Sequence, residues 1–224
     1  MLQLDHLAVC CATLADGVAA VEQALGVALA PGGNHGHMAT HNRLLALGDI
    51  YLEVIAADPN APPPAWPRWF DLDHFSGSPR LTNWVAACQD LDAELALSPV
   101  GAGTPLSLTR GDLRWRMAVP ATGKLPFDGC FPALISWQGS LHPAQALPDM
   151  GVRLTRLEIA HPRAADLSDH LSDRFSDPRI VFVAAPCKRL ARDVFHAARH
   201  TFSGLTCLFF VLASSFMRLQ HLHP

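Results

Sequence analysis

Charged residues are scarce in this chain of 224 residues. Only 17% of them are Asp, Glu, Lys or Arg, a low share for a soluble protein, and the net charge is −3. The sequence lacks the basic surplus with which proteins neutralise phosphates, so we expect no nucleic-acid partner. Hydrophobic residues make up 50% of the chain, enough for the core of one large domain or two small ones.

Paired-cysteine spacings are also missing. The six cysteines include no CxxC pair, and Cys10 and Cys11 are neighbours in a predicted buried strand. We therefore expect reduced core cysteines in a cytoplasmic protein. No basic segment followed by a long apolar run stands at the N-terminus, so no secretory signal is expected. The sequence also contains no GxSxG, P-loop or GxGxxG motif.

The chain does contain a strand-like frame that occurs three times. It reads Leu-x-x-apolar at residues 4–11, 81–88 and 154–161, with starts 77 and 73 residues apart, and a helical pattern follows each copy. The third position of the frame changes from His6 to Asn83 to Arg156. Because repeats of this length mark repeated structural units, the frame predicts two full modules and a partial third one.

The first repeat predicts a strand, a helix and further strands. Thr13 is a candidate N-cap, apolar residues recur at helical spacing over 14–25, and Gly26 stands where a C-cap glycine belongs. Pro31-Gly32-Gly33 predicts a turn. The remaining predicted elements are strands at 41–47 and 50–56, with a hairpin turn at Gly48-Asp49 between them.

The second repeat predicts the same order of elements. A strand ends near Cys88 and a short helix runs between Asp90 and Pro99. The later strands are expected at 106–109, 113–119 and 133–137. The connection at 58–77 contains five prolines together with Trp66, Trp69 and Phe70, so we expect an ordered segment that packs on the first module.

The third repeat is partial. Strands are expected at 152–160 and 179–184, with a helix between them. From residue 186 onward the chain has five Lys or Arg and one acid, and residues 201–217 carry no charge. Three interpretations are open: a membrane-associating helix, a structural tail, or a sequence read out of frame after about Pro186. We favour the last two, because this uncharged run is a weak membrane span.

His6 and Glu53 are the leading candidates for a metal site. Because side chains alternate along a strand, we expect His6 and Asp5 on opposite faces of the first strand. For the same reason we expect Glu53 and Tyr51 on one face of the strand at 50–56. If the helix covers the apolar faces, both side chains project away from it and could bind one divalent metal. His41 could join them. A lone strand histidine is more often an ordinary core or surface residue, but a carboxylate among apolar neighbours needs water or a partner.

Arg114 and Arg116 share one face of a predicted strand, and Trp115 and Met117 share the other. We expect the apolar face to pack on a helix, which leaves the arginines either in solvent or in the same cavity as His6. In a cavity they would favour an anionic ligand. His142 follows the strand at 133–137 and could reach the mouth of that cavity.

These residues resemble the vicinal oxygen chelate superfamily, and in particular its glyoxalase-like domain branch. The resemblance covers residues 1–185. It is carried by the Leu-Asp-His-Leu-Ala-Val start of the first strand and by four further segments: Thr40-His41-Asn42-Arg43 with Leu47-Gly48-Asp49, Tyr51-Leu52-Glu53-Val54-Ile55, Trp137 with His142-Pro143 and Pro148, and Leu157 to Pro162.

The resemblance implies an α+β fold of tandem βαβββ modules, as in glyoxalase and bleomycin-resistance proteins, with mixed curved sheets and a partial third βαβ repeat. The modules would span 1–58 and 78–138, the partial unit 152–185, and an atypical tail 186–224. Such a fold implies a divalent metal, Zn, Ni, Mn or Fe, held in a cup between modules by His6 and Glu53. The second module departs from the pattern, since its equivalents are Asn83 and about Ser136. Either His41 or His142 completes the site with water, or no metal binds.

Two functions follow from the resemblance. The first is a metal-dependent lyase, isomerase or dioxygenase that acts on a small anionic molecule, with Glu53 and His41 as catalytic residues. The second is a metal-free protein that binds or sequesters a small molecule. The candidate substrate-binding residues are Arg43, Trp84, Arg114, Arg116 and His142. A membrane partner is not expected, and a homodimer is left open.

Overall fold

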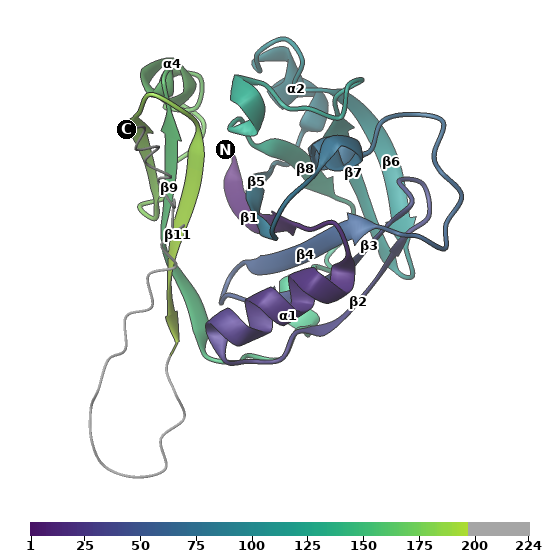
Figure 1. Ribbon diagram of the computed structural model, residues 1–224. Helices are drawn as coiled ribbons and strands as arrows, with labels where there is room; N and C mark the ends of the chain where they lie inside the picture. Colours follow the sequence, from purple (N-terminus) through teal and green to yellow (C-terminus); the bar gives the residue numbers. More distant parts are fainter. Residues whose placement is uncertain (197–224) are drawn as a thin grey trace, which may run out of the picture.

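The computed structural model describes residues 1–196, and its larger sheet has eight strands in the order β2-β3-β4-β1-β5-β8-β7-β6 (Figure 1). The first module consists of β1 (Gln3–Cys10), α1 (Leu14–Leu25), β2 (Ala30–His35), β3 (Thr40–Ala46) and β4 (Tyr51–Ala57). The second consists of β5 (Arg80–Ala87), α2 (Leu91–Ala96), β6 (Thr104–Arg110), β7 (Leu113–Val119) and β8 (Ala133–Trp137). The expected α+β fold of tandem βαβββ modules is confirmed.

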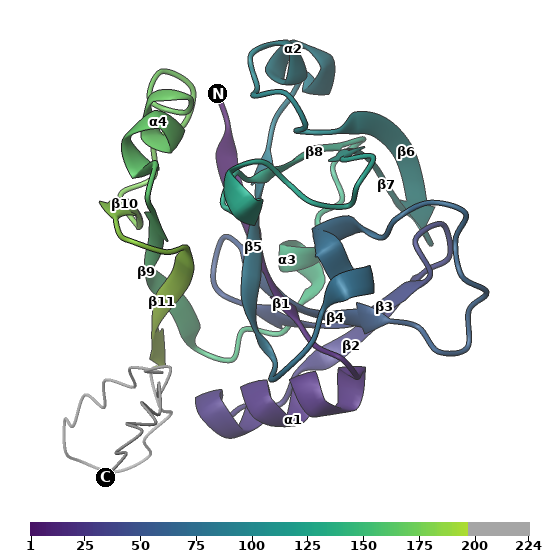
Figure 2. The same ribbon diagram turned by 45° about the horizontal axis from the view of Figure 1, so that its top comes forward.

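The two modules meet at the centre of this sheet, where β1 and β5 pair in antiparallel fashion. Within each module the first strand runs parallel to the last, β1 to β4 and β5 to β8. The sheet curls, so that one face is concave and the other carries α1 and α2 (Figures 1 and 2). This arrangement brings the first and last strands of both modules side by side.

A second sheet stands beside the first, with the strand order β10-β9-β11 (Figure 2). It is built from β9 (Val152–His161), α4 (Ala164–Asp169), β10 (Ile180–Ala184) and β11 (Arg189–His196). Strand β10 is parallel to β9 and β11 is antiparallel to it, as β4 and β5 are to β1. Strand β11 lies beyond residue 185, so the expected boundary of the tail stays a prediction. The uncharged run at 201–217 lies outside the described residues.

Each copy of the repeated frame contains a β-bulge at its second position. Pairing skips Asp5 in β1 and Thr82 in β5, where these two strands meet, and it skips Thr155 in β9 opposite β11. A bulge adds one unpaired residue and changes the direction of the side chains beside it. The repeated Leu-x-x pattern is therefore the sequence signature of a repeated bulge.

The local signals of α1 are found as expected. Thr13 Oγ1 accepts a hydrogen bond from the Asp16 amide at 3.2 Å, and Gly26 closes the helix with φ of 68°. Gly17 lets the helix approach the sheet, because a Cβ there would lie 2.4 Å from Cys11 Sγ. The predicted turn at residues 31–33 is wrong, since these residues lie inside β2, where the pairing to β3 shifts register.

The connection between the modules covers the concave face. It contains the short helix η1 (Trp69–His74), in which Trp69, Phe70 and Leu72 are buried. The Asp71 amide donates to Gly123 O at 3.0 Å, which ties the segment to the second module. The connection is therefore ordered, as expected, but it contacts the second module as well as the first, where Arg68 Nε donates to Ala39 O at 3.2 Å. Two further short helices are η2 (Phe127–Gly129) and α3 (Pro143–Ala146).

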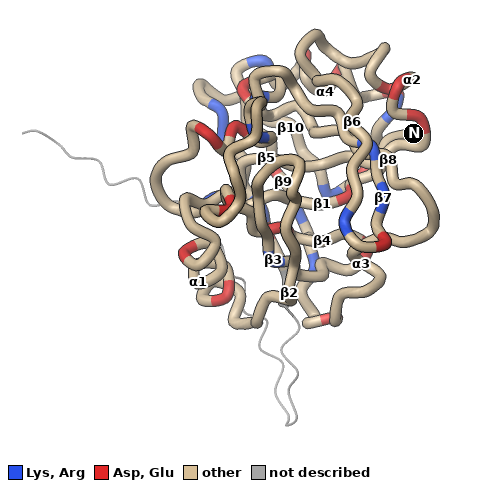
Figure 3. The backbone as a smooth tube through the Cα atoms, turned by 90° about the vertical axis from the view of Figure 1, so that its right-hand side faces the viewer, with Lys and Arg blue, Asp and Glu red and all other residues tan. Residues whose placement is uncertain are grey.

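Two apolar clusters form the core. One fills the space between the helices, the large sheet and the third unit, where Trp84 packs on Phe175 with ring centroids 5.3 Å apart. The other lines the concave face beneath η1 and includes Trp69, Trp115 and Met117. Figure 3 shows acidic residues on α1 and basic residues along β7.

Among the helices formed by residues 1–196, none is both long and apolar enough to span a bilayer.

Candidate functional site

A pocket opens on the concave face of the large sheet, beneath η1. It comprises about 400 Å³ of empty space, counted together with its open mouth. Its polar lining residues are His6, His35, Asn42, Glu53 and Arg110, and its aromatic lining residues are Tyr51, Trp69, Phe70, Trp115 and Trp137. The pocket therefore joins a polar floor to aromatic walls, the usual makeup of a small-molecule site.

His6 lies between two carboxylates on this floor. Its Nδ1 donates to Asp5 Oδ1 at 2.5 Å, and its Nε2 lies 3.6 Å from Glu53 Oε2. The second distance is too long for a hydrogen bond, so that attraction is electrostatic. Burial alone would lower the pKa of His6, but the hydrogen bond to Asp5 and the charge of Glu53 raise it to about 9. His6 is therefore a buried imidazolium at neutral pH.

Asp5 contacts His6, and the β1 bulge at Asp5 changes the direction of the side chains there. Its Oδ2 accepts from Trp137 Nε1 at 2.8 Å and lies 3.1 Å from His142 Nε2. Burial would raise the pKa of Asp5, but its hydrogen bonds with His142 and His6 hold that pKa well below the usual range. The expectation that Asp5 faces away from His6 is wrong, because simple alternation does not hold across a bulge.

Glu53 is oriented by Asn42. The Asn42 side-chain oxygen accepts from the Gly33 amide at 2.8 Å, so its nitrogen must be the atom that donates to Glu53 Oε1 at 2.5 Å. This leaves Oε2 on the side of His6. Burial would raise the pKa of Glu53, but the contacts with His6 and Asn42 lower it to about 2. Glu53 is therefore a fixed, charged carboxylate.

His35 stands at the other end of the floor, beside Arg110. The Arg110 guanidinium only donates, so His35 Nε2, at 3.1 Å from Nη1, must carry the lone pair. His35 Nδ1 then donates to Thr40 Oγ1 at 3.2 Å. Burial is the main cause that lowers the pKa of His35 to about 4, in agreement with a neutral ring.

Tyr51 packs directly on His6, with ring centroids 4.4 Å apart and planes at 16°. Burial raises the pKa of its hydroxyl well above the usual value, so the ring stays neutral. This stacking holds the His6 imidazolium in place and covers one of its faces.

The floor fits two ligands of a divalent metal. His6 Nε2 and Glu53 Oε2 face each other at 3.6 Å, close to the separation of about 3–3.5 Å between two donors of one metal. The hydrogen bond from His6 Nδ1 to Asp5 is the support that metal-binding histidines usually have. Residues 1–196 contain no group of three or more His, Cys, Asp or Glu that could hold a metal ion.

The second module adds no ligand. Its counterpart of Glu53 follows from register: Ala8 lies opposite Glu53, and the matching pair in module two is Val85 with Ala133. The expected counterpart near Ser136 is therefore wrong by three residues. Asn83, the counterpart of His6, turns to Gly129 O at 3.4 Å.

The other expected site residues divide between the pocket and the surface. His142 reaches the site through Asp5. His41 and Arg43 project from the opposite face of β3, because Asn42 between them takes the pocket side. His41 Nε2 is buried without a hydrogen-bond partner among the described residues.

The expected facing of β7 is reversed. Trp115 lines the pocket, whereas Arg116 donates to both carboxylate oxygens of Asp92 in α2, at 2.8 and 3.0 Å. Arg114 is exposed and donates to Gly111 O at 3.2 Å. Trp84 is fully buried in the other core cluster, where its Nε1 donates to Cys130 O at 2.9 Å. The structure therefore does not bring these two arginines or Trp84 to the pocket.

Several pocket residues escaped the sequence analysis. The sequence did not predict that Arg110 lines the pocket. This arginine ends a strand beside the Gly111-Asp112 turn, where an ordinary surface residue is expected. His35 follows closely after the predicted turn at residues 31–33, so the sequence did not place it on a strand. Asn42 could have been found from the sequence. It lies two positions before Leu44, so alternation along the strand places it on the same buried face.

Comparison with known proteins agrees with this fold. The model of the family described as glyoxalase-like domain matches residues 4–175. A hypothetical protein from Staphylococcus aureus has a similar structure, with a TM-score of 0.57, 13% identity, and coverage of 90% of this chain and 93% of the other. Methylmalonyl-CoA epimerase from Mycobacterium tuberculosis aligns over 62% of this chain and 88% of its own, with a TM-score of 0.41 and 15% identity.

None of the curated proteins compared with the sequence matches it. The family match spans both modules and the start of the third unit, including the strand that carries His6 and the strand that carries Glu53. It confirms the expected resemblance to the vicinal oxygen chelate superfamily. The chain therefore belongs to the glyoxalase-like domain family.

Proposed function

We propose that this protein is a metal-dependent enzyme that acts on a small anionic molecule in the pocket beneath η1. The observation that carries the proposal is the position of His6, whose Nδ1 is fixed by Asp5 while its Nε2 faces a carboxylate oxygen of Glu53. Asp5 and Asn42 each hold one of these two side chains, so the pair is set before any ligand arrives.

The metal would be bound by His6 and Glu53, with water or the substrate in its other positions. Binding would require His6 Nε2 to release the proton that it carries in the metal-free protein. A bound divalent ion supplies Lewis acidity for neighbouring oxygens of a substrate. Tyr51 and Asp5 keep the His6 ring in one orientation, and Asn42 keeps one Glu53 oxygen engaged. The other Glu53 oxygen is then free to act as a ligand or to accept a proton.

A second candidate function has its own support. The second module offers Asn83 and Ala133 where a symmetric metal cup would need ligands. A site with two protein ligands binds metal less firmly than one with four, so a metal-free binding protein is the alternative. In that case the His6 imidazolium would meet the ligand as a charged hydrogen-bond donor.

Metal content distinguishes the two candidates. Protein purified without chelator and then dialysed against Zn, Ni, Mn or Fe should hold about one equivalent by elemental analysis. The double variant His6→Gln, Glu53→Gln should hold less than a tenth of that, while the exposed control His74→Ala should equal the unchanged protein. Thermal melting confirms that the variants are folded.

Two results would count against the proposal. Less than a tenth of an equivalent in the unchanged protein, with every metal tried, would favour the metal-free alternative. Full metal content in the folded double variant would show that other residues bind the ion.

A further inference from the structure

Arg110 connects the two edges of the large sheet. It ends β6, which is one edge strand, and its Nη1 lies 3.1 Å from His35 Nε2 on β2, the other edge strand. The same nitrogen lies 3.4 Å from Asn42 Oδ1. The arginine therefore bridges the seam where the curled sheet comes closest to closing, at one end of the pocket floor.

The charge of Arg110 has no acidic partner among residues 1–196. Its two side-chain contacts, His35 and Asn42, are neutral acceptors. Arg116, Arg153 and Arg174, in contrast, each form an ion pair. A guanidinium that lines a pocket without a carboxylate keeps donors available for an anion.

Trp69 supplies a second unpaired donor at the same end of the pocket. Its Nε1 is buried and makes no hydrogen bond within the described part of the chain. Its ring packs edge-on against His35 at 5.1 Å, so it borders the residue that Arg110 contacts. A buried N–H without a partner is unfavourable, and a hydrogen bond to a ligand oxygen would remove that cost.

The space between these donors and His6 has flat aromatic sides. Trp115 and Trp137 lie with ring centroids 5.6 Å apart and line the pocket together with Trp69. On the pocket floor, Asn42 lies between Arg110 and Glu53 and forms a hydrogen bond with each of them. A ligand that spans the floor is therefore short, and its body meets aromatic surfaces.

We infer that Arg110 and Trp69 Nε1 form a carboxylate subsite, and that the ligand of this pocket is a small acid with a flat apolar body. The carboxylate pairs with the Arg110 guanidinium and accepts from Trp69 Nε1. The flat body lies against Trp115 and Trp137, and any further oxygens point toward His6 and Glu53. This inference rests on the proposed function, because it concerns the same pocket.

Binding to chelator-treated protein tests the subsite separately from any metal. The probes are benzoylformate, its uncharged methyl ester, and pyruvate, which lacks the ring. Calorimetric titration should give the lowest Kd for benzoylformate, with the ester and pyruvate at least tenfold weaker. Arg110→Gln should raise the Kd for benzoylformate by about tenfold or more. Trp69→Phe should raise it by about threefold or more.

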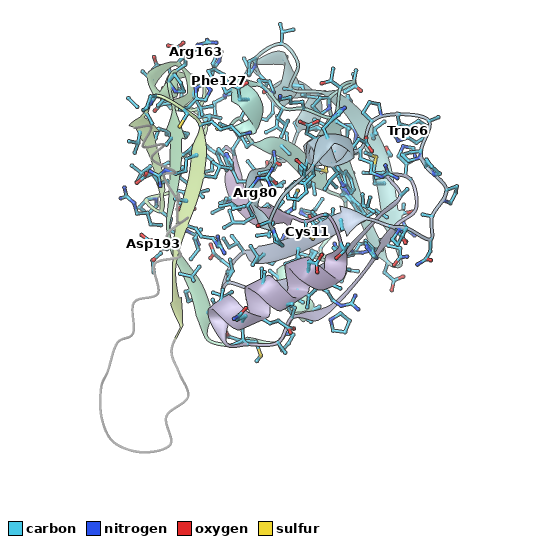
Figure 4. The ribbon with its side chains drawn as sticks, viewed as in Figure 1. Cys11, Trp66, Arg80, Phe127, Arg163 and Asp193 are labelled. Atoms are coloured by element: carbon cyan, nitrogen blue, oxygen red, sulfur yellow. The ribbon has the colours of Figure 1, made fainter. Side chains whose placement is uncertain are left out.

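The control variants match these changes at sites outside the pocket. Arg114→Gln removes an exposed arginine, and Trp66→Phe changes an indole at the outer side of the connection (Figure 4). Both should bind benzoylformate as the unchanged protein does. Arg110→Lys, which keeps the charge, should retain part of the affinity, and melting curves show which variants are folded.

Three results would overturn the inference. They are no binding of any probe at 10 mM by the unchanged protein, equal binding of acid and ester, or unchanged affinity in folded Arg110→Gln. A Kd for pyruvate as low as that for benzoylformate would contradict the inference that the ligand has a flat apolar body. If the protein binds no metal but its probe affinities follow the predicted order, the carboxylate subsite is supported and the metal-dependent function is contradicted. The two proposals can therefore fail separately.

Discussion

His6 is a charged residue that is 4% exposed and is stabilised by its neighbours on both sides. Its imidazolium is favoured by Asp5 and Glu53, and Tyr51 covers the ring. The same contacts explain why Glu53 stays ionised on an apolar strand. The histidine and the carboxylate therefore stabilise the fold as well as forming the centre of the site.

The pKa of His6 predicts a pH dependence of stability. Because the folded value of about 9 lies above the ordinary 6.5, the contribution is fully present below pH 6.5 and is lost as pH rises through 9. A shift of this size corresponds to about 3 kcal/mol. Urea unfolding of chelator-treated protein at pH 6.5 and 9.5 should show the loss, and His6→Gln should show a much smaller one. Equal losses in both proteins would contradict the assignment.

At this scale the sequence analysis found His6 and Glu53 because alternation along regular strands sorts side chains by face. It missed Asp5 for a physical reason. A bulge depends on how two strands pair, and nothing in the local composition of β1 marks the residue that pairing skips.

Among the elements, β7 shows what alternation leaves undecided. The pattern separated Trp115 from Arg116 correctly, but it held no information on which side faces the helix, and the side we expected was the wrong one. Both surfaces of this sheet are covered by apolar groups, α2 on one side and η1 on the other. Only the curl of the sheet shows that the aromatic side is the concave one.

The packing of α1 on the sheet predicts a cost for one methyl group. A Cβ at Gly17 would lie 2.4 Å from Cys11 Sγ and 2.7 Å from Val54 Cγ1. The overpacking cost of about 1–3 kcal/mol should exceed the gain of about 1 kcal/mol in helix propensity. Gly17→Ala should therefore lower the free energy of unfolding. Gly36→Ala, where no atom lies within 4 Å of the new Cβ, is the control and should stay within about 0.5 kcal/mol.

For the whole molecule, ion pairs attach the third unit to both modules. Arg179 donates to both oxygens of Asp49 in the β3–β4 turn, at 2.8 and 2.9 Å. Arg174 contacts Glu94 of α2 at 2.8 Å and the Leu97 carbonyl at 3.1 Å. The repeat predicted a third unit, but these contacts between segments far apart in sequence had no local signal.

The Arg174 contact predicts a measurable effect on stability. Its side chain and that of Glu94 are 12% and 13% exposed, so the pair is largely shielded from solvent. Arg174→Gln should lower the free energy of unfolding by about 1–3 kcal/mol, since charged hydrogen bonds are lost. The control Arg116→Gln breaks a pair that is 33% and 62% exposed and should cost under about 1 kcal/mol. Equal effects in denaturant unfolding would contradict the role of this contact.

The site of metal binding is the central claim, and anomalous diffraction from zinc-soaked crystals tests it most directly. We predict a single strong peak about 2.0–2.2 Å from both His6 Nε2 and a carboxylate oxygen of Glu53. A peak elsewhere in the pocket, or none at His6 and Glu53 in crystals whose zinc content is established, would contradict the account.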